Sequence, residues 1–135
     1  MHLVDTGLAC HLLGADARRL SEDRPLLGWL LESFVVGELR KQLSWSDPWT
    51  TLYHFRTATG SEVDLVLEKP DGSVAAIEVK ASATVGTSDF TALQALRDQL
   101  GKLFRAGVVI YVGDQIIPFG DKLWLVPLPI LWVSF

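Results

Sequence analysis

The fold is decided by the stretch Gly60-Ser61-Glu62-Val63-Asp64-Leu65-Val66-Leu67-Glu68 together with Ala75-Ala76-Ile77-Glu78-Val79-Lys80. Both stretches alternate apolar and polar residues, and such alternation predicts strands whose successive side chains point to opposite faces. The residues between them, Lys69-Pro70-Asp71-Gly72-Ser73, are typical of a tight turn. We therefore expect a hairpin of two adjacent strands.

Charged side chains are expected to gather on this hairpin. Glu62 and Asp64 share one face of the first strand, and Glu78 and Lys80 share one face of the second. Mg²⁺ prefers oxygen ligands and keeps several waters, so two or three carboxylates are an adequate protein contribution. Asp64 and Glu78 are the first candidates to hold Mg²⁺ or Mn²⁺, and Lys80 is the candidate to orient a water or neutralise charge on a phosphate.

The other elements follow from hydrophobic spacing and from turn residues. The predicted helices span residues 2–14, 26–43 and 90–104, separated by a polar loop or ragged helix over 15–24 and a break at 44–50. The predicted strands outside the hairpin span 51–57, 107–113, 115–118 and 122–126. Their order predicts an α/β fold with an αβββαβ core, in which helices flank a mixed central sheet.

The helical period also predicts which side chains the two longer helices bury. For the first of these helices the expected stripe is Leu27, Leu30, Leu31, Phe34, Val35 and Leu39. For the second it is Leu93, Leu96, Leu100 and Leu103.

Composition restricts the class of protein. With 135 residues, of which 49% are hydrophobic and 21% charged, the chain suits a single domain with a real core. The single cysteine, Cys10, excludes an internal disulfide and fits a reducing cytoplasm, where we expect the protein to reside. No apolar run is long enough to span a bilayer. The net charge of −4 disfavours broad nonspecific binding to nucleic acid.

These residues carry a family resemblance. The chain resembles the PD-(D/E)XK nuclease superfamily in four features. These are an acidic residue on one strand, a turn, Glu-x-Lys on the next strand and a glutamate on an upstream helix. Asp64 matches the first acidic position, while Glu78 and Lys80 match Glu-x-Lys. The helical glutamate would be Glu32, with Glu38 as the alternative. The resemblance implies a restriction-endonuclease-like fold and metal-dependent cleavage of DNA.

A second resemblance covers most of the chain. The chain resembles the C-terminal domain of unknown function of bacterial and archaeal AAA+ ATPases. Six segments carry this resemblance, in the same order along the chain: residues 4–8, 31–35, 54–57, 60–67, 77–82 and 126–128. It implies an ATPase part preceding residues 1–135, so that the chain is either a C-terminal fragment or a solitary module. Two functions stay open: a Mg²⁺-dependent nuclease or DNA-binding domain attached to the ATPase, and a catalytically inactive domain that regulates or docks it.

Several further residues have two interpretations each. Glu62 either joins the metal site or flanks it, and Arg56 either contacts a phosphate or is a surface arginine. The three histidines lack zinc-ligand spacing. The five tryptophans favour core and interface positions over base stacking, because no basic residues are interleaved with them. The apolar tail, 123–135, is a candidate surface for another domain or for a homo-oligomer.

Overall fold

The computed structural model describes residues 11, 14 and 16–133. The helix predicted over 2–14 and the cysteine at position 10 fall largely outside these residues. In chain order the elements are α2 (Ala17–Glu22), α3 (Arg24–Ser46), β1 (Thr51–Arg56), β2 (Glu62–Glu68), β3 (Val74–Lys80), η1 (Thr87–Phe90), α4 (Thr91–Leu100), η2 (Gly101–Leu103), β4 (Phe104–Tyr111), β5 (Ile117–Pro118), β6 (Leu123–Pro127) and η3 (Leu128–Trp132).

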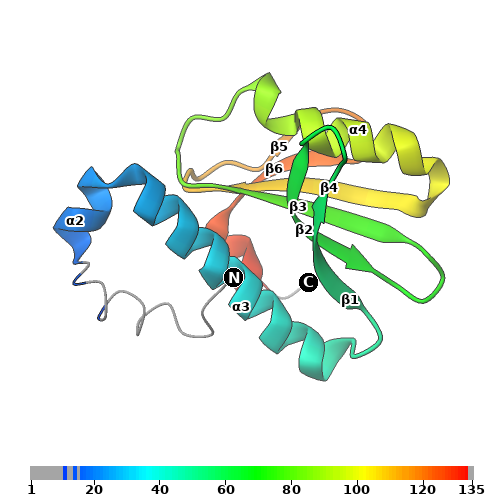
Figure 1. Cartoon of the computed structure of the whole chain (residues 1–135), viewed down its shortest axis with the longest axis horizontal. Helices are drawn as coiled ribbons and strands as arrows, with labels where there is room; N and C mark the ends of the chain where they lie inside the picture. Colours follow the sequence, from blue (N-terminus) through cyan, green and yellow to red (C-terminus); the bar gives the residue numbers. More distant parts are fainter. Residues whose placement is uncertain (1–10, 12–13, 15, 134–135) are drawn as a thin grey trace.

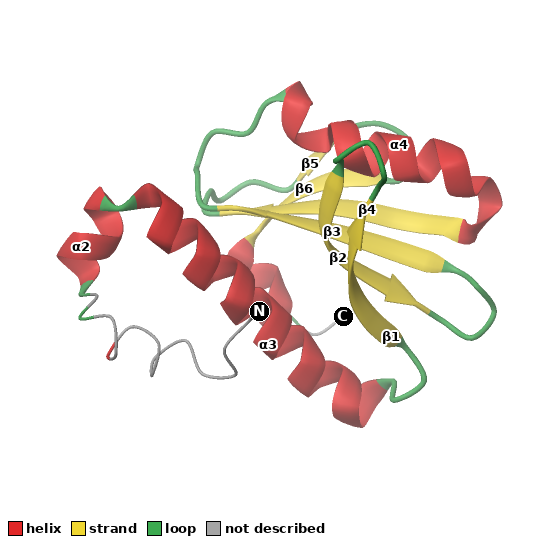
Figure 2. Ribbon diagram, in the orientation of Figure 1, coloured by secondary structure: helices red, strands yellow, loops and turns green. Residues whose placement is uncertain are grey.

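The strands form one mixed sheet of six strands, in the order β1-β2-β3-β4-β6-β5. The β1–β2 and β2–β3 pairs are antiparallel, β3–β4 and β4–β6 are parallel, and the short β5 closes the edge antiparallel to β6. Figure 1 shows α3 and α4 on opposite sides of this sheet, and Figure 2 separates helices from strands in the same view. The predicted α/β fold with a mixed central sheet is confirmed.

The predicted hairpin between β2 and β3 is present, and its turn has the expected chemistry. The Lys69 backbone N–H donates to the carbonyl of Ser73 over 3.0 Å, and Gly72 adopts φ 84°, a conformation that glycine reaches without strain. Asp71 accepts hydrogen bonds from the backbone N–H and the hydroxyl of Ser73, at 2.9 and 2.6 Å. The turn therefore fixes the pairing of the two strands that carry the charged residues.

The core has two parts, one on each face of the sheet. Beneath α4, Leu93 and Leu96 pack in a cluster with Phe90, Phe104 and residues of the sheet. Beneath α3, Val35 packs with Ile110 and Val126, and Leu39 lies against them. Each long helix therefore covers one apolar face, as a helix–sheet–helix domain requires.

The first long helix, α3, is longer than predicted and buries a different set of residues. It starts after Asp23, whose carboxylate accepts from the Leu26 N–H at 3.1 Å, and continues through Ser46. The short helix α2 occupies part of the segment predicted as a polar loop or ragged helix. The fully buried residues of α3 are Leu30, Ser33, Val35 and Val36. The predicted stripe was thus wrong in part, because the small polar Ser33 faces inward and a hydrophobic pattern does not count it.

The second predicted helix is divided into three. A 3₁₀ turn precedes α4, Gly101 ends it with φ 56°, and Phe104 already belongs to β4. Leu103 is 45% exposed, so its predicted burial was wrong. The reversal at Gly101 turns the chain before Leu103 can follow the helical stripe. Phe104, which is completely buried, occupies the core instead.

The tryptophans are less buried than expected. None of the five is in the buried core; Trp45 and Trp49, near the end of α3, are 74% and 77% exposed, and Trp132 is 54% exposed. Trp124 packs at the edge of the cluster beneath α3. Among the residues that the structure describes, no helix combines the length and the apolar character needed to cross a membrane.

Candidate functional site

A β-bulge shapes the strand that carries the first candidate carboxylate. Tyr53 pairs with Val66, whereas Phe55 pairs with Val63, so β2 contains one residue more than β1 between these pairs. Asp64 and Leu65 therefore both lie opposite His54, which is the pattern of a β-bulge. The predicted strict alternation fails here, since Leu65 and Val66 are both buried. Bulges of this kind redirect side chains, and this one redirects Asp64.

Asp64 reaches across to the neighbouring strand. Its Oδ2 accepts a hydrogen bond from the backbone N–H of Val79 at 2.8 Å. The backbone pairing of β2 with β3 ends at Leu65 and Ile77, and the Asp64 carboxylate continues the contact between the two strands beyond that point. This bond anchors the Asp64 side chain beside Glu78.

Glu78 is the one buried carboxyl group among the described residues. Its exposed fraction is 7%. Burial, the charge of Asp64 and a side-chain hydrogen bond with Asp64 raise the pKa of Glu78 to about 9, while the nearby Lys80 opposes the shift. The Glu78 carboxyl group consequently holds its proton at neutral pH. Pairs like Asp64 and Glu78 arise where two carboxyl groups occupy one site, and functional sites are rich in them.

Glu32 approaches the same place from α3. Burial raises the pKa of its carboxyl group, the charges of Asp64 and Glu62 raise it further, and His54 opposes them. These effects require proximity, so Glu32 lies within electrostatic range of Asp64 although the two are far apart in sequence. The structure thereby brings together three of the carboxyl groups that the sequence singled out. Glu38, the alternative, instead pairs with Lys41 at 3.1 Å.

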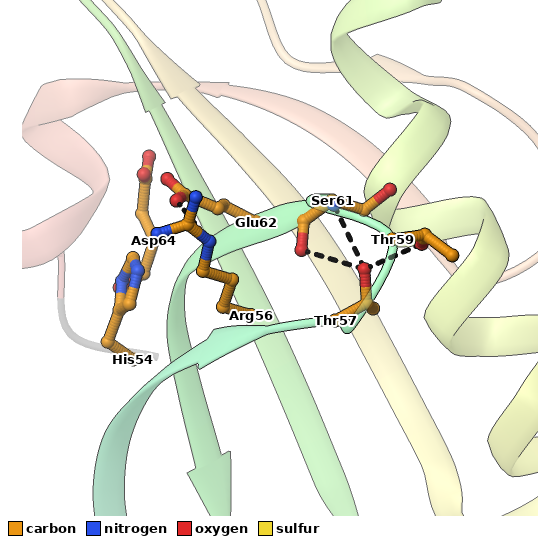
Figure 3. Close-up of polar contacts among 7 residues, drawn as sticks. All are labelled: His54, Arg56, Thr57, Thr59, Ser61, Glu62 and Asp64. Carbon is orange, nitrogen blue, oxygen red and sulfur yellow. Dashed lines mark hydrogen bonds and ion pairs between the residues drawn. The ribbon is translucent and has the colours of Figure 1, made fainter.

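Lys80 and Arg56 already have acidic partners. The Lys80 ammonium lies 3.5 Å from Oδ1 of Asp89, in η1. Arg56 Nε lies 3.1 Å from Oε1 of Glu62, its partner across β1 and β2. Figure 3 shows Arg56 and Glu62 beside Asp64 and His54. Glu62 therefore flanks the carboxylate pair and holds Arg56 next to it.

Sequence reasoning missed the roles of His54 and Asp89. The Nδ1 atom of His54 lies 3.1 Å from the backbone oxygen of Asp64, in hydrogen-bonding contact. Pairing the predicted strand 51–57 with the hairpin would have placed His54 near Asp64. Asp89 reads in sequence as a helix cap, and it does accept from the Gly86 N–H at 2.9 Å. Its second contact, with Lys80, has no signal in the sequence.

The carboxyl groups described above can be compared with the ligands that a divalent cation requires. In the described part of the chain, no three His, Cys, Asp or Glu side chains are close enough together to surround one ion. The site therefore offers the two carboxyl groups of Asp64 and Glu78, with Glu32 farther away. Mg²⁺ is commonly held by one or two carboxylates and keeps several waters, so this donor set fits it.

Fold and site together define a mixed α/β domain in which the half-buried Asp64 and the buried Glu78 meet at the open end of the β2–β3 hairpin. Comparison with known proteins gives the family. Residues 27–131, which include all of the candidate site residues, match the family described as a domain of unknown function, DUF4143. The chain belongs to this family.

Relatives exist among longer proteins. The chain is 32% identical over 127 residues to an uncharacterized protein of Mycobacterium bovis and equally to one of Mycobacterium tuberculosis. The match covers 94% of this chain but only 27% of each relative. The chain thus spans about a quarter of the length of the curated relatives it matches.

One solved structure is similar in part. It is an assembly of Thermococcus gammatolerans McrB AAA+ hexamers with bound McrC, matched with a TM-score of 0.49 and 17% sequence identity. The match covers 74% of this chain and 27% of the other.

Proposed function

We propose that this domain binds and cleaves DNA with Mg²⁺ or Mn²⁺, as a nuclease-like module of PD-(D/E)XK type. The observation that carries the proposal is the Asp64–Glu78 pair. The buried Glu78 carboxyl group lies in hydrogen-bonding contact with Asp64, whose own carboxylate is fixed by the Val79 N–H. A divalent cation would replace the proton of Glu78 and neutralise both carboxylates at once, which is why the pair favours a metal site.

Asp64 and Glu78 would hold the metal, and Glu32 would contribute from α3 through a water. When bound, a divalent cation lowers the pKa of a coordinated water and stabilises negative charge on a phosphate. The bulge and the Val79 N–H hold the Asp64 carboxylate in place before any ligand arrives. Such preorganisation avoids the cost of ordering the side chain during reaction.

Lys80 would act on the attacking water or on the phosphate. Its side chain is 39% exposed and its ammonium is near enough to Glu78 to lower the pKa of that carboxyl group. The 3.5 Å contact with Asp89 holds the ammonium at the entrance of the site. Because exposed ion pairs contribute only about 0–1 kcal/mol, a phosphate can replace Asp89 at small cost.

Nucleic acid would be bound locally rather than by a broad basic surface. The chain carries a net charge of −4, but Arg56 and Lys80 are both exposed beside the carboxyl pair. Arginine contacts phosphate with two parallel hydrogen bonds, and Arg56 would need to release Glu62 to do so. Affinity for DNA should then depend on the metal, because few phosphates are neutralised by side chains alone.

A second candidate function is a catalytically inactive domain that docks or regulates an AAA+ ATPase. The exposed Trp45 and Trp49 favour it, since large exposed apolar side chains often mark interaction surfaces. In either case we propose that the domain works attached to an ATPase part, as the sequence resemblance implies. The relatives are long enough to contain such a part beside this domain.

The experiment is a cleavage assay on the purified chain, with single-stranded and duplex DNA and with Mg²⁺ or Mn²⁺. Asp64→Asn and Lys80→Ala should each reduce cleavage at least about tenfold, given the usual effect of removing a catalytic group. Asp98→Asn and Lys102→Ala change exposed charges outside the site and serve as matched controls. Cleavage that survives both site substitutions would refute the assignment. No cleavage by the wild-type chain would favour the docking function.

A further inference from the structure

A cavity lies between the β1–β2 hairpin and α4, separate from the carboxyl pair. Its volume is about 210 Å³. It is lined by Phe55, Thr57, Thr59, Ser61 and Val63 of the hairpin and by Ala92, Ala95, Leu96 and Gln99 of α4. The metal-site proposal makes no use of any of these residues.

The lining has no charged side chain. Its floor is apolar, with Val63 and Leu96 buried and Phe55 half-buried. Its rim carries the hydroxyl groups of Thr59 and Ser61 and the amide of Gln99, all on exposed residues. Such a site suits a neutral ring with polar edges, because the floor accepts the ring and the rim can donate and accept hydrogen bonds. The lining offers no charged side chain that could neutralise a bound ion.

The hairpin that forms one wall is held in a fixed shape. Figure 3 shows Thr57 at the centre of a small hydrogen-bond network. Its hydroxyl accepts from the Ser61 N–H at 2.9 Å, contacts the Ser61 carbonyl at 3.2 Å, and lies 3.0 Å from the Thr59 hydroxyl. The Thr57 side chain thus organises the loop and contacts the Thr59 hydroxyl, while the Ser61 hydroxyl and the Gln99 amide are the rim groups offered to a ligand.

Size favours a single ring system. An engineered apolar cavity of about 150 Å³ in another protein holds benzene, so a cavity of 210 Å³ has room for one heteroaromatic base. Neutral heteroaromatic rings with donor and acceptor edges are what nucleic acids present when a base leaves its stack.

The pocket and Asp64 share the β1–β2 hairpin, while Glu78 lies on the adjoining strand β3. Phe55 pairs with Val63 and lines the pocket, while the next pair, Arg56 with Glu62, lies beside Asp64. Successive residues of a strand point to opposite faces, so Phe55 and Arg56 lie on opposite faces of the β1–β2 hairpin. A nucleotide chain crossing the hairpin could place a base on one face and a phosphate on the other.

We propose that this cavity is a nucleobase pocket, which receives one unstacked base of the DNA bound at the carboxyl pair. The assignment rests on the proposed nucleic-acid function and deepens it. A base can enter only if it is unstacked, so the pocket selects single-stranded DNA or a flipped nucleotide over regular duplex. Arg56 would then meet the adjoining phosphate.

The test is ligand-observed NMR on the metal-free chain, with thymidine, deoxyadenosine and 2-deoxyribose as probes. The nucleosides should bind and the sugar alone should not. Ala95→Leu fills the pocket from α4 and should weaken nucleoside binding at least tenfold. Ala58→Leu makes the same change on an exposed hairpin residue outside the lining and should leave binding unchanged. Gln99→Met, which keeps the length of the side chain and removes the rim amide, should weaken binding without affecting the fold.

Oligonucleotides distinguish the source of the base. Oligo(dT) should bind more tightly than thymidine, and a duplex of the same length should bind more weakly than oligo(dT). Binding of nucleosides but not of oligo(dT) would overturn the DNA assignment in favour of a free nucleoside. Failure of all nucleosides would overturn the pocket while leaving the cleavage assay to decide the metal site. Nucleoside binding without metal-dependent cleavage would retain the pocket and refute the nuclease.

Discussion

At the scale of single residues, the sequence located the carboxyl pair but could not give its geometry. Alternation in two strands was enough to select Asp64 and Glu78. The bulge opposite His54 and the bond from the Val79 N–H to Asp64 depend on strand register, which a local pattern does not contain. Burial of Glu78 likewise depends on tertiary packing, which a local pattern does not contain. The raised pKa of Glu78 is therefore a property of the fold.

Glu78→Gln should stabilise the protein at alkaline pH. The pKa of Glu78 is raised from 4.5 to about 9, so the folded state holds the proton more tightly than the unfolded state. Its contribution to stability is full below pH 4.5 and is lost as pH rises toward 9. The glutamine mimics the protonated acid at every pH. The variant should match the wild type at pH 4.5 and exceed it by at least about 1 kcal/mol at pH 8.

The measurement is the free energy of unfolding by urea at both pH values. Glu22→Gln, on the exposed surface of α2, is the matched control and should show no such growth with pH. A difference between Glu78→Gln and the wild type that is equal at pH 4.5 and pH 8 would contradict the protonated state of Glu78.

Asp89→Asn should strengthen metal-dependent DNA binding. Asp89 occupies the Lys80 ammonium at 3.5 Å, and asparagine keeps the oxygen that caps the Gly86 N–H while removing the charge. An exposed ion pair of this kind contributes up to about 1 kcal/mol, so the affinity should rise by up to about fivefold. Fluorescence anisotropy with labelled single-stranded DNA measures it. Asp98→Asn should change nothing, and weaker binding by Asp89→Asn would argue that Lys80 does not meet the phosphate.

At the scale of elements, hydrophobic periodicity predicted which segments form the main helices and strands. The residues at which these elements end are set by single residues instead. The hairpin, α3, α4 and β4 all occur where hydrophobic spacing placed them. The errors concentrate where backbone conformation overrides periodicity. Gly101 stops α4 before Leu103, and Ser33 faces the sheet because α3 packs there. The burial of Ser33 depends on tertiary packing, whereas the stop at Gly101 is a local backbone effect that hydrophobic spacing does not include.

Gly107→Ala should destabilise the protein through β4. A Cβ atom at this position would lie 2.6 Å from Cδ2 of Leu123 and 2.8 Å from Cζ of Phe104, and both side chains are completely buried. Overpacking of this kind typically costs about 1–3 kcal/mol. Gly28→Ala is the matched control, because it lies within α3 with open space around it and should stabilise the helix by up to about 1 kcal/mol. Thermal unfolding of both variants gives the comparison, and equal effects would contradict the close packing at Gly107.

At the scale of the whole molecule, the candidate site joins the two halves of the fold. Glu32 comes from the helix on one face of the sheet, whereas Asp89 precedes the helix on the other face. The carboxyl pair lies in the sheet between them. A ligand that binds there would connect both faces, so its binding should be visible in the stability of the entire domain.

Mg²⁺ should therefore raise the melting temperature, and its removal with EDTA should reverse the change. A ligand that binds only the folded state stabilises it by about 1.4 kcal/mol at tenfold its dissociation constant, which corresponds to a shift of several degrees in a domain of this size. Asp64→Asn should abolish the shift, because it removes a charge from the pair without removing bulk. Asp98→Asn should preserve the shift, and NaCl at equal ionic strength controls for screening. A Mg²⁺ shift of equal size in Asp64→Asn would show that the cation binds elsewhere, and no shift in the wild-type chain at 10 mM Mg²⁺ would place any dissociation constant above about that concentration.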